Sequence, residues 1–160
     1  MSNQDIHKIF EEALNDPNLF STLDIDKLLD SIETDKNDYL ETKTMKSITD
    51  EVYDVLFERI RQKDLAKDMC KKLLGYRYVD EINELHKGKH IRWVRNGNNT
   101  LTNGGIVVDI EFLDNGTHVL CKNAMNRFTQ YKFDECITFQ KLSTEEQLIL
   151  MAYEYTNTTH

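Results

Sequence analysis

The residues best suited to bind a ligand form a basic cluster near the middle of the chain. It consists of Lys87, Lys89, Arg92 and Arg95, with His86 and His90 beside them. Basic side chains on a small sheet can follow a phosphate backbone while aromatic rings stack on the bases, which predicts nucleic-acid binding. The same charges can instead guard an exposed strand edge against pairing with other chains. The guarded strand edge is the favoured interpretation, and nucleic-acid binding is the alternative.

Aromatic residues are dense in the same part of the chain and allow two interpretations. They are Trp93, Phe112, Phe128, Tyr131, Phe133 and Phe139. A cage of such rings would bind a methylated Lys or Arg through cation–π attraction. Because most of these rings fall on the predicted core face of their strands, core packing is the favoured interpretation.

No pattern in the chain indicates catalysis or metal binding. Cys70, Cys121 and Cys136 are scattered and form no Cys-x-x-Cys pair, so the ligand spacing of a structural zinc site is missing. His118 lies three residues before Cys121 on a predicted strand, so the two side chains would face opposite sides. No spacing places a histidine beside a cysteine nucleophile, and no phosphate-binding loop or dinucleotide fingerprint occurs. We therefore predict no enzyme activity, no cofactor and no metal.

The acidic segment 30–41 resembles a calcium-binding loop only in its charge. Counted from Asp35, the fifth position is Tyr39 and the sixth is Leu40, where a calcium loop needs an oxygen ligand and a glycine. The prediction for this segment is therefore a solvated loop.

Charge is unevenly distributed along the 160 residues, whose formal net charge is −8. Residues 1–86 hold 12 Lys and Arg against 20 Asp and Glu, whereas residues 87–141 hold 8 against 5. An acidic surface repels nucleic acid, so nucleic acid would bind the basic part. No apolar run approaches the ~20 residues that span a bilayer, and the N-terminus lacks the features of a secretory signal. We expect no membrane association and a cytoplasmic or nucleocytoplasmic location.

Five alternating runs between residues 88 and 141 predict short antiparallel strands. They cover residues 90–94, 106–112, 117–122, 128–133 and 137–141. The turn Asp114-Asn115-Gly116 is a strong hairpin signal because Asn and Gly tolerate positive φ. The alternation predicts a core face that includes Trp93, Ile106, Val108, Ile110, Phe112, Val119, Cys121, Tyr131, Phe133, Ile137 and Phe139.

Helical periodicity predicts an N-terminal half rich in helices. The expected helices cover residues 5–15, 23–33, 42–60, 64–74 and 80–85, and residues 76–79 are ambiguous. Gly75 occupies the position of a left-handed residue that ends a helix. Ser143-Thr144-Glu145-Glu146 is a capping box that opens a last helix, and residues 156–160 are expected to form a frayed tail.

The order of strands and turns between Ile91 and Phe139 resembles the SH3-like barrels, including Tudor-type domains. The resemblance rests on residues 91–94, 105–112, 114–116, 119–122 and 128–139, about a third of the chain. The chain lacks the usual sequence signature of the 3₁₀ turn that joins the last two strands of such barrels, although Asp134-Glu135 could fill its place. The resemblance implies binding of peptides, modified histone tails or nucleic acid. The composition, rich in Lys, Asn and Ile, is similar to that of uncharacterised proteins of large DNA viruses, which would place the chain in a host cell.

These observations predict an α+β protein in which a helical region, residues 1–86, packs on a five-stranded antiparallel SH3-like barrel, residues 87–142. A C-terminal helix, residues 143–155, and the tail 156–160 follow. The leading functional hypothesis is a non-enzymatic protein–protein interaction or scaffold module whose partner is another protein. The alternative is a nucleic-acid-binding accessory protein whose contacts are Lys87, Lys89, Arg92 and Arg95. The oligomeric state stays open.

Overall fold

The computed structural model describes Leu40 and residues 43–158, without the side chains of residues 156–158. Contacts divide the chain into two compact units. Residues 49–141 are called the sheet unit below, and residues 1–48 with 142–160 are called the terminal unit. The helices expected at 5–15 and 23–33 lie outside the described residues, as does the candidate calcium loop apart from Leu40.

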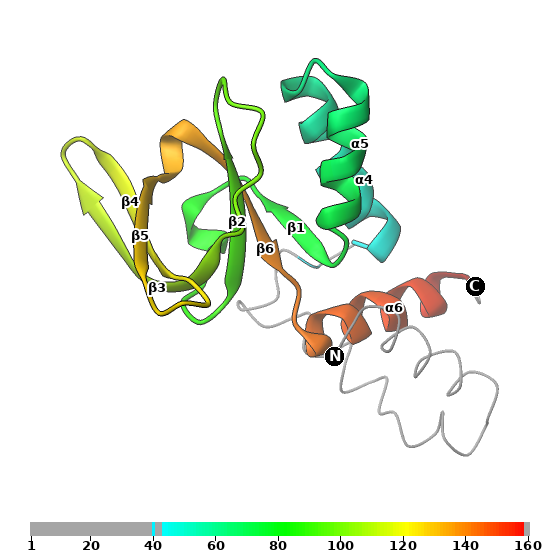
Figure 1. The fold of residues 1–160 in the computed structure, drawn as a ribbon. Helices are drawn as coiled ribbons and strands as arrows, with labels where there is room; N and C mark the ends of the chain where they lie inside the picture. Colours follow the sequence, from blue (N-terminus) through cyan, green and yellow to red (C-terminus); the bar gives the residue numbers. More distant parts are fainter. Residues whose placement is uncertain (1–39, 41–42, 159–160) are drawn as a thin grey trace. The chain divides into compact units, whose positions relative to one another are not determined.

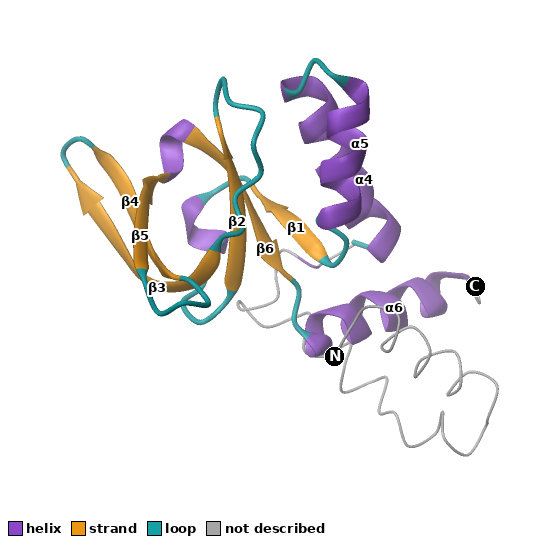
Figure 2. Ribbon diagram, in the orientation of Figure 1, coloured by secondary structure: helices purple, strands orange, loops and turns teal. Residues whose placement is uncertain are grey.

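The described residues form an α+β fold with three α-helices and one six-stranded antiparallel sheet (Figures 1 and 2). The elements are α4 (Met45–Arg59), α5 (Lys63–Lys72), β1 (Tyr76–Val79), β2 (His90–Arg95), β3 (Gly105–Leu113), β4 (Gly116–Lys122), β5 (Phe128–Lys132), β6 (Cys136–Lys141) and α6 (Thr144–Thr158). The strand order is β1-β6-β2-β3-β4-β5. The α+β class is confirmed. The five-stranded barrel is not confirmed, because the sheet has six strands and is not closed.

The sixth strand, β1, is the segment whose conformation the periodicity left ambiguous. Four residues are too few to show a period, and pairing with β6 decides their conformation, with Tyr76 opposite Lys141 and Val79 opposite Thr138. Gly75 precedes this strand with a φ of +85°, the left-handed conformation expected after a helix. The helix expected at 80–85 is reduced to a single 3₁₀ turn, Ile82–Glu84.

The sheet buries side chains on two faces. The inner face holds one apolar cluster, which includes Val79, Leu85, Ile91, Trp93, Val107, Val119, Cys121 and Tyr131. On the outer face, α4 and α5 cover β6, and Leu56 and Met69 pack in one cluster with Phe139. Both faces of β6 are therefore buried from Ile137 to Gln140. The predicted burial of Phe139 is confirmed, but its neighbours are the helices and not Trp93.

A β-bulge in β3 changes which residues face the core. The pairing of β3 with β4 shifts register between Val107 and Asp109. Before the bulge Val107 is 1% exposed and Ile106 is 47% exposed, so the prediction for Ile106 was wrong. After the bulge Ile110 packs against the inner cluster as predicted. The single extra residue reverses the alternation, because side chains on a strand change face at every position.

The ends of β3 and β5 also differ from the expected core. Phe112 is exposed, because it lies near the β3–β4 turn, beyond the inner cluster. β5 ends at Lys132, and Phe133 begins the 3₁₀ turn Phe133–Glu135 that leads into β6. Such a turn is what the resemblance to SH3-like barrels placed at this point. Phe133 is half-buried against the inner cluster.

In the terminal unit, α6 begins at the predicted capping box. Ser143 Oγ accepts a hydrogen bond from Glu146 N at 3.1 Å, and Glu146 Oε1 accepts one from Ser143 N at 2.9 Å. These two bonds satisfy backbone donors that a helix start leaves without intrahelical partners. The helix continues to Thr158, past the predicted end at 155. Among the described helices, none combines the length and the apolar character needed to cross a membrane.

Candidate functional site

The four basic residues predicted to contact phosphates have different surroundings. Lys87 Nζ lies 3.4 Å from Asp109 Oδ1, and Lys89 is half-buried just before β2. Arg92 Nε donates to the main-chain oxygen of Thr102 at 2.8 Å, which ties this side chain to the loop between β2 and β3. Arg95 is exposed at the end of β2. A common phosphate-binding role for the four remains a prediction.

His90 adds little positive charge to this cluster at neutral pH. Tyr76 Oη lies 2.9 Å from His90 Nδ1, on the neighbouring part of the sheet unit. Burial lowers the pKa of His90, and the charges of Lys141 and Arg92 lower it further. Because the pKa falls below its ordinary value of 6.5, the imidazole is neutral at pH 7.

Arg95 lines a hollow together with Arg59, which is distant from it in the sequence, and Arg61 lines the adjoining hollow. The connection between α4 and α5 runs beside the loop that follows β2 (Figure 2). Between them are two adjoining hollows of about 400 Å³ and about 60 Å³, which share Arg59, Gly97 and Asn98. Together they are called the arginine pocket, and the residues that line it are Arg59, Ile60, Arg61, Gln62, Val94, Arg95, Asn96, Gly97, Asn98, Asn99 and Ile137.

The sequence contained one signal for this pocket. Arg59 and Arg61 stand together where the predicted helix 42–60 ends, a position that favours exposure. Sequence spacing alone could not bring them to Arg95, because the contact depends on α4 and α5 packing on the outer face of the sheet.

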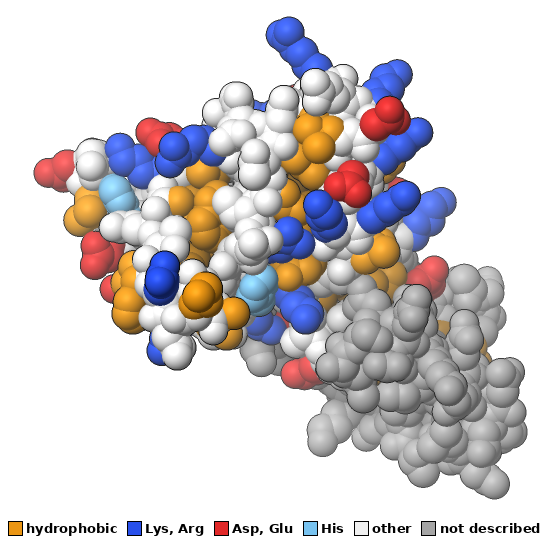
Figure 3. Space-filling model, viewed as in Figure 1, with side chains coloured by type: hydrophobic (Ala, Val, Ile, Leu, Met, Phe, Trp, Pro, Cys, Tyr) orange, Lys and Arg blue, Asp and Glu red, His pale blue; other side chains and the backbone are white. Residues whose placement is uncertain are grey.

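Apolar side chains are exposed on the outer face of the other half of the sheet. Ile106 pairs in register with Lys122, and Lys122 pairs with Phe128, so the three form one row across β3, β4 and β5. Phe128 is 63% exposed, and Met125, in the turn before β5, is 72% exposed. Ile106, Met125 and Phe128 are called the apolar row. Figure 3 shows hydrophobic side chains, in orange, over the β3–β4–β5 part of the sheet.

The aromatic rings do not gather around one exposed site. Trp93 and Tyr131 stack in the inner cluster with ring centroids 4.1 Å apart and planes 13° apart. Tyr131 Oη is also within 2.9 Å of Thr138 Oγ1, so its polar end is satisfied in the core. Phe112 and Phe128 are exposed, but the first lies near the β3–β4 turn and the second near the β4–β5 turn. Their positions give core packing more support than a cage.

The cysteines are poorly suited to nucleophilic chemistry. Cys121 is buried, and burial raises its pKa to about 12, so it is a thiol at neutral pH. Burial also raises the pKa values of Cys70 and Cys136. Within the described ranges, no group of three or more His, Cys, Asp or Glu residues could hold a metal ion.

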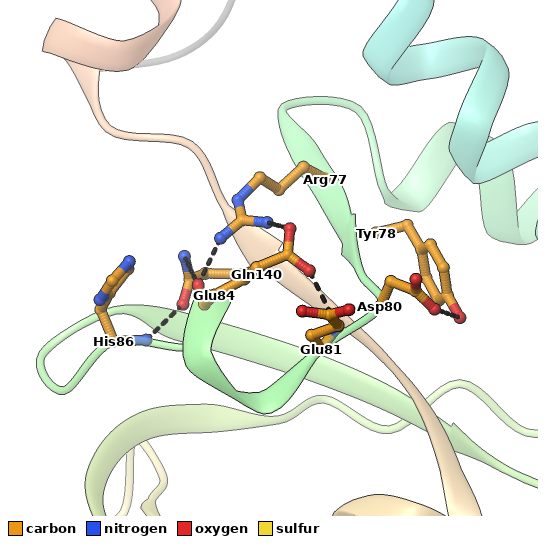
Figure 4. Close-up of polar contacts among 7 residues, drawn as sticks. All are labelled: Arg77, Tyr78, Asp80, Glu81, Glu84, His86 and Gln140. Atoms are coloured by element: carbon orange, nitrogen blue, oxygen red, sulfur yellow. Dashed lines mark hydrogen bonds and ion pairs between the residues drawn. The ribbon is translucent and has the colours of Figure 1, made fainter. Parts of the chain in front are cut away.

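A buried polar network joins β1 and β6 to the segment that leads into β2 (Figure 4). Arg77 is 2% exposed and donates from Nη1 to Glu84 Oε1 at 3.2 Å and from Nη2 to the main-chain oxygen of Glu84. Gln140, opposite Arg77 in the sheet, accepts from His86 N at 2.9 Å. Burial lowers the pKa of Arg77, and the charge of Glu84 raises it again. The network holds residues 84–86 against β1 and β6.

Replacing Arg77 with methionine is expected to lower the free energy of unfolding of the sheet unit by about 2 kcal/mol, because charge-assisted hydrogen bonds are lost at a buried position. Urea denaturation followed by Trp93 fluorescence measures the change. Glu84→Gln keeps the main-chain acceptor for Arg77 and should cost less than Arg77→Met. An Arg77→Met variant as stable as wild type would show that the network contributes no stability.

No family model, curated protein or solved structure matches this chain. The similarity to proteins of large DNA viruses therefore has no support from a family or a homologue. The functional proposals below depend on the geometry of the sheet unit.

Proposed function

We propose that the sheet unit is a non-enzymatic interaction module that binds another protein through the apolar row and the adjacent edge of β5. The observation that carries this proposal is the row itself. Ile106 and Phe128 flank Lys122 in register on the outer face of β3, β4 and β5, whereas α4 and α5 pack against β6. Single exposed apolar residues are ordinary on protein surfaces, whereas exposed apolar residues gathered on one face and bordered by polar ones mark interaction sites.

The edge of β5 supports the same proposal. β5 ends the strand order, so its outer edge carries main-chain donors and acceptors without a neighbouring strand in the sheet. An extended segment of a partner protein can pair with such an edge as an additional strand. Main-chain hydrogen bonds then give affinity, and contacts made by every second side chain give specificity. We propose that apolar side chains of the partner contact Phe128 and Met125. Lys122 and Arg127 favour a partner segment that also contains acidic residues.

The proposal of a non-enzymatic role is supported by the surroundings of Cys121 and Arg77. Cys121 is buried as a thiol, and the buried Arg77 pairs with the partly exposed Glu84 in holding the chain together. Nucleic-acid binding by Lys87, Lys89, Arg92 and Arg95 is the weaker proposal, because Lys87 pairs with Asp109 and Arg92 is bound to main-chain oxygen.

The full-length protein should recover a partner from native cell extract, and Ile106→Ser with Phe128→Ser should weaken that complex at least about 30-fold. This factor corresponds to the roughly 2 kcal/mol lost at an interface hot spot. The affinity is measured with the purified partner. Leu74→Ser is the control, because Leu74 is 61% exposed, close to the 63% of Phe128, but lies outside the apolar row.

Two results would contradict the proposal. One is a partner that binds the double variant as tightly as wild type. The other is recovery of no partner together with measurable turnover in a broad hydrolase or transferase screen. Both substituted residues are exposed, so the variants should retain the wild-type far-ultraviolet circular dichroism spectrum.

A further inference from the structure

We propose that the arginine pocket binds the phosphate group of a small organic phosphate. This site is independent of the apolar row, because it lies between the α4–α5 connection and the loop after β2. The ligand class follows from the charges, the hydrogen-bond donors and the size of the pocket.

Positive charge in the pocket is not neutralised by neighbouring acids. Arg59, Arg61 and Arg95 form no ion pair with a carboxylate in the part of the chain that the structure describes. No Asp or Glu is among the residues that line the pocket, although Glu58 and Asp64 are near it in the sequence. Arginine presents a planar set of donors that matches the oxygens of a phosphate, often through two parallel hydrogen bonds.

The loop after β2 supplies neutral donors and a fixed shape. Asn98 N donates to the main-chain oxygen of Arg95 at 2.9 Å, and Asn96 N donates to that of Glu135 at 2.9 Å. Gly97 has a φ of +80°, which allows the turn between them. These bonds hold the loop beside the arginines before any ligand arrives, so little ordering is needed on binding. The side-chain amides of Gln62, Asn98 and Asn99 add N–H donors at the pocket wall.

The size and lining of the pocket favour a small phosphate compound. A volume of about 400 Å³ lies in the range of small-molecule sites. No aromatic ring lines the pocket, so it lacks a surface on which a nucleic-acid base would stack. Long-range repulsion is also weak here: residues 49–141 contain 15 Lys and Arg against 14 Asp and Glu, although the whole chain carries −8.

The experiment titrates inorganic pyrophosphate into the full-length protein by isothermal titration calorimetry at constant ionic strength. Amide chemical shifts measured by NMR locate the site. Wild type should bind pyrophosphate, with the largest shifts at Gly97, Asn98 and Asn99. Arg59→Gln with Arg61→Gln should weaken binding at least about tenfold, because charge-assisted hydrogen bonds to the anion are lost. Arg95→Gln alone should also weaken it.

Arg127→Gln is the matched control, because it removes the same charge from an exposed arginine of the sheet unit outside the pocket. Its affinity should stay within about twofold of wild type. The proposal is overturned if pyrophosphate does not bind, or if Arg127→Gln weakens binding as much as the double variant does. It is also overturned if a single-stranded oligonucleotide binds the pocket and pyrophosphate does not. None of these outcomes changes the test of protein binding by the apolar row.

Discussion

Gly104→Ala is expected to lower the free energy of unfolding of the sheet unit by about 3–5 kcal/mol. Gly104 has a φ of +72°, and an added Cβ would lie 1.8 Å from the main-chain oxygen of Ile91. The left-handed conformation costs a non-glycine residue about 1–2 kcal/mol, and forcing atoms into a packed site costs about 1–3 kcal/mol or more. Because the clash is with backbone at the centre of the sheet, no side-chain rotation relieves it.

Gly88→Ala separates these two costs. Gly88 has a φ of +87°, but an added Cβ would meet nothing within 4 Å. This variant should therefore lose only the conformational term, about 1–2 kcal/mol. Urea denaturation followed by Trp93 fluorescence gives both values. If the two variants were equally stable, the close approach of the loop to β2 would have no energetic consequence, contrary to this prediction.

Trp93→Ala should cost about 3–5 kcal/mol, the range found when a large buried ring is truncated. Trp93 is 7% exposed and stacks on Tyr131 in the inner cluster. Its removal would leave Tyr131 without a stacking partner and open a cavity between β2 and β5. Far-ultraviolet circular dichroism in urea measures the loss, since the variant has no tryptophan left to report it.

Phe128→Ala is the control for Trp93→Ala, because it truncates an exposed aromatic ring of the same sheet and should change stability by about 0.5 kcal/mol or less. The native protein should also show the blue-shifted emission of a buried indole. Red-shifted emission before denaturation would place Trp93 in water, and the ring would then be available to stack on a ligand.

Local patterns predicted the elements of the fold better than their arrangement. The apolar stripe of Ile48, Val52 and Leu56 predicted α4, and the capping box at Ser143 predicted the start of α6. Both signals depend on near neighbours along the chain. The conformation of β1 stayed ambiguous in the sequence because its four residues pair with β6, which is distant along the chain.

The core face predicted from the alternation along β3 was wrong at Ile106 for a similar reason. Nothing in the run from Gly105 to Leu113 marks Val108 as the site of a bulge. Near the start of this run, apolar residues occupy consecutive positions, so the sequence does not show which of them face the core. The candidate sites show the same limit. Exposure of Arg95 could be anticipated from its place at a strand end, but its proximity to Arg59 required the packing of α4 on the sheet.

The position of β6 between β1 and β2 also affects how the chain folds while the ribosome synthesises it. β6 is the last strand of the sheet to be synthesised, yet β1 and β2 both pair with it. Within the meander of β3, β4 and β5 each strand pairs with its neighbour along the chain, so this pairing is expected early. β1 cannot pair with β6 until Lys141 has left the exit tunnel. During that interval the nascent chain exposes the apolar surface of α4 and α5 and two unpaired strand edges. Substitutions in β6 that slow its pairing with β1 and β2 will prolong this exposure after Lys141 has emerged, as well as lower the stability of the finished sheet.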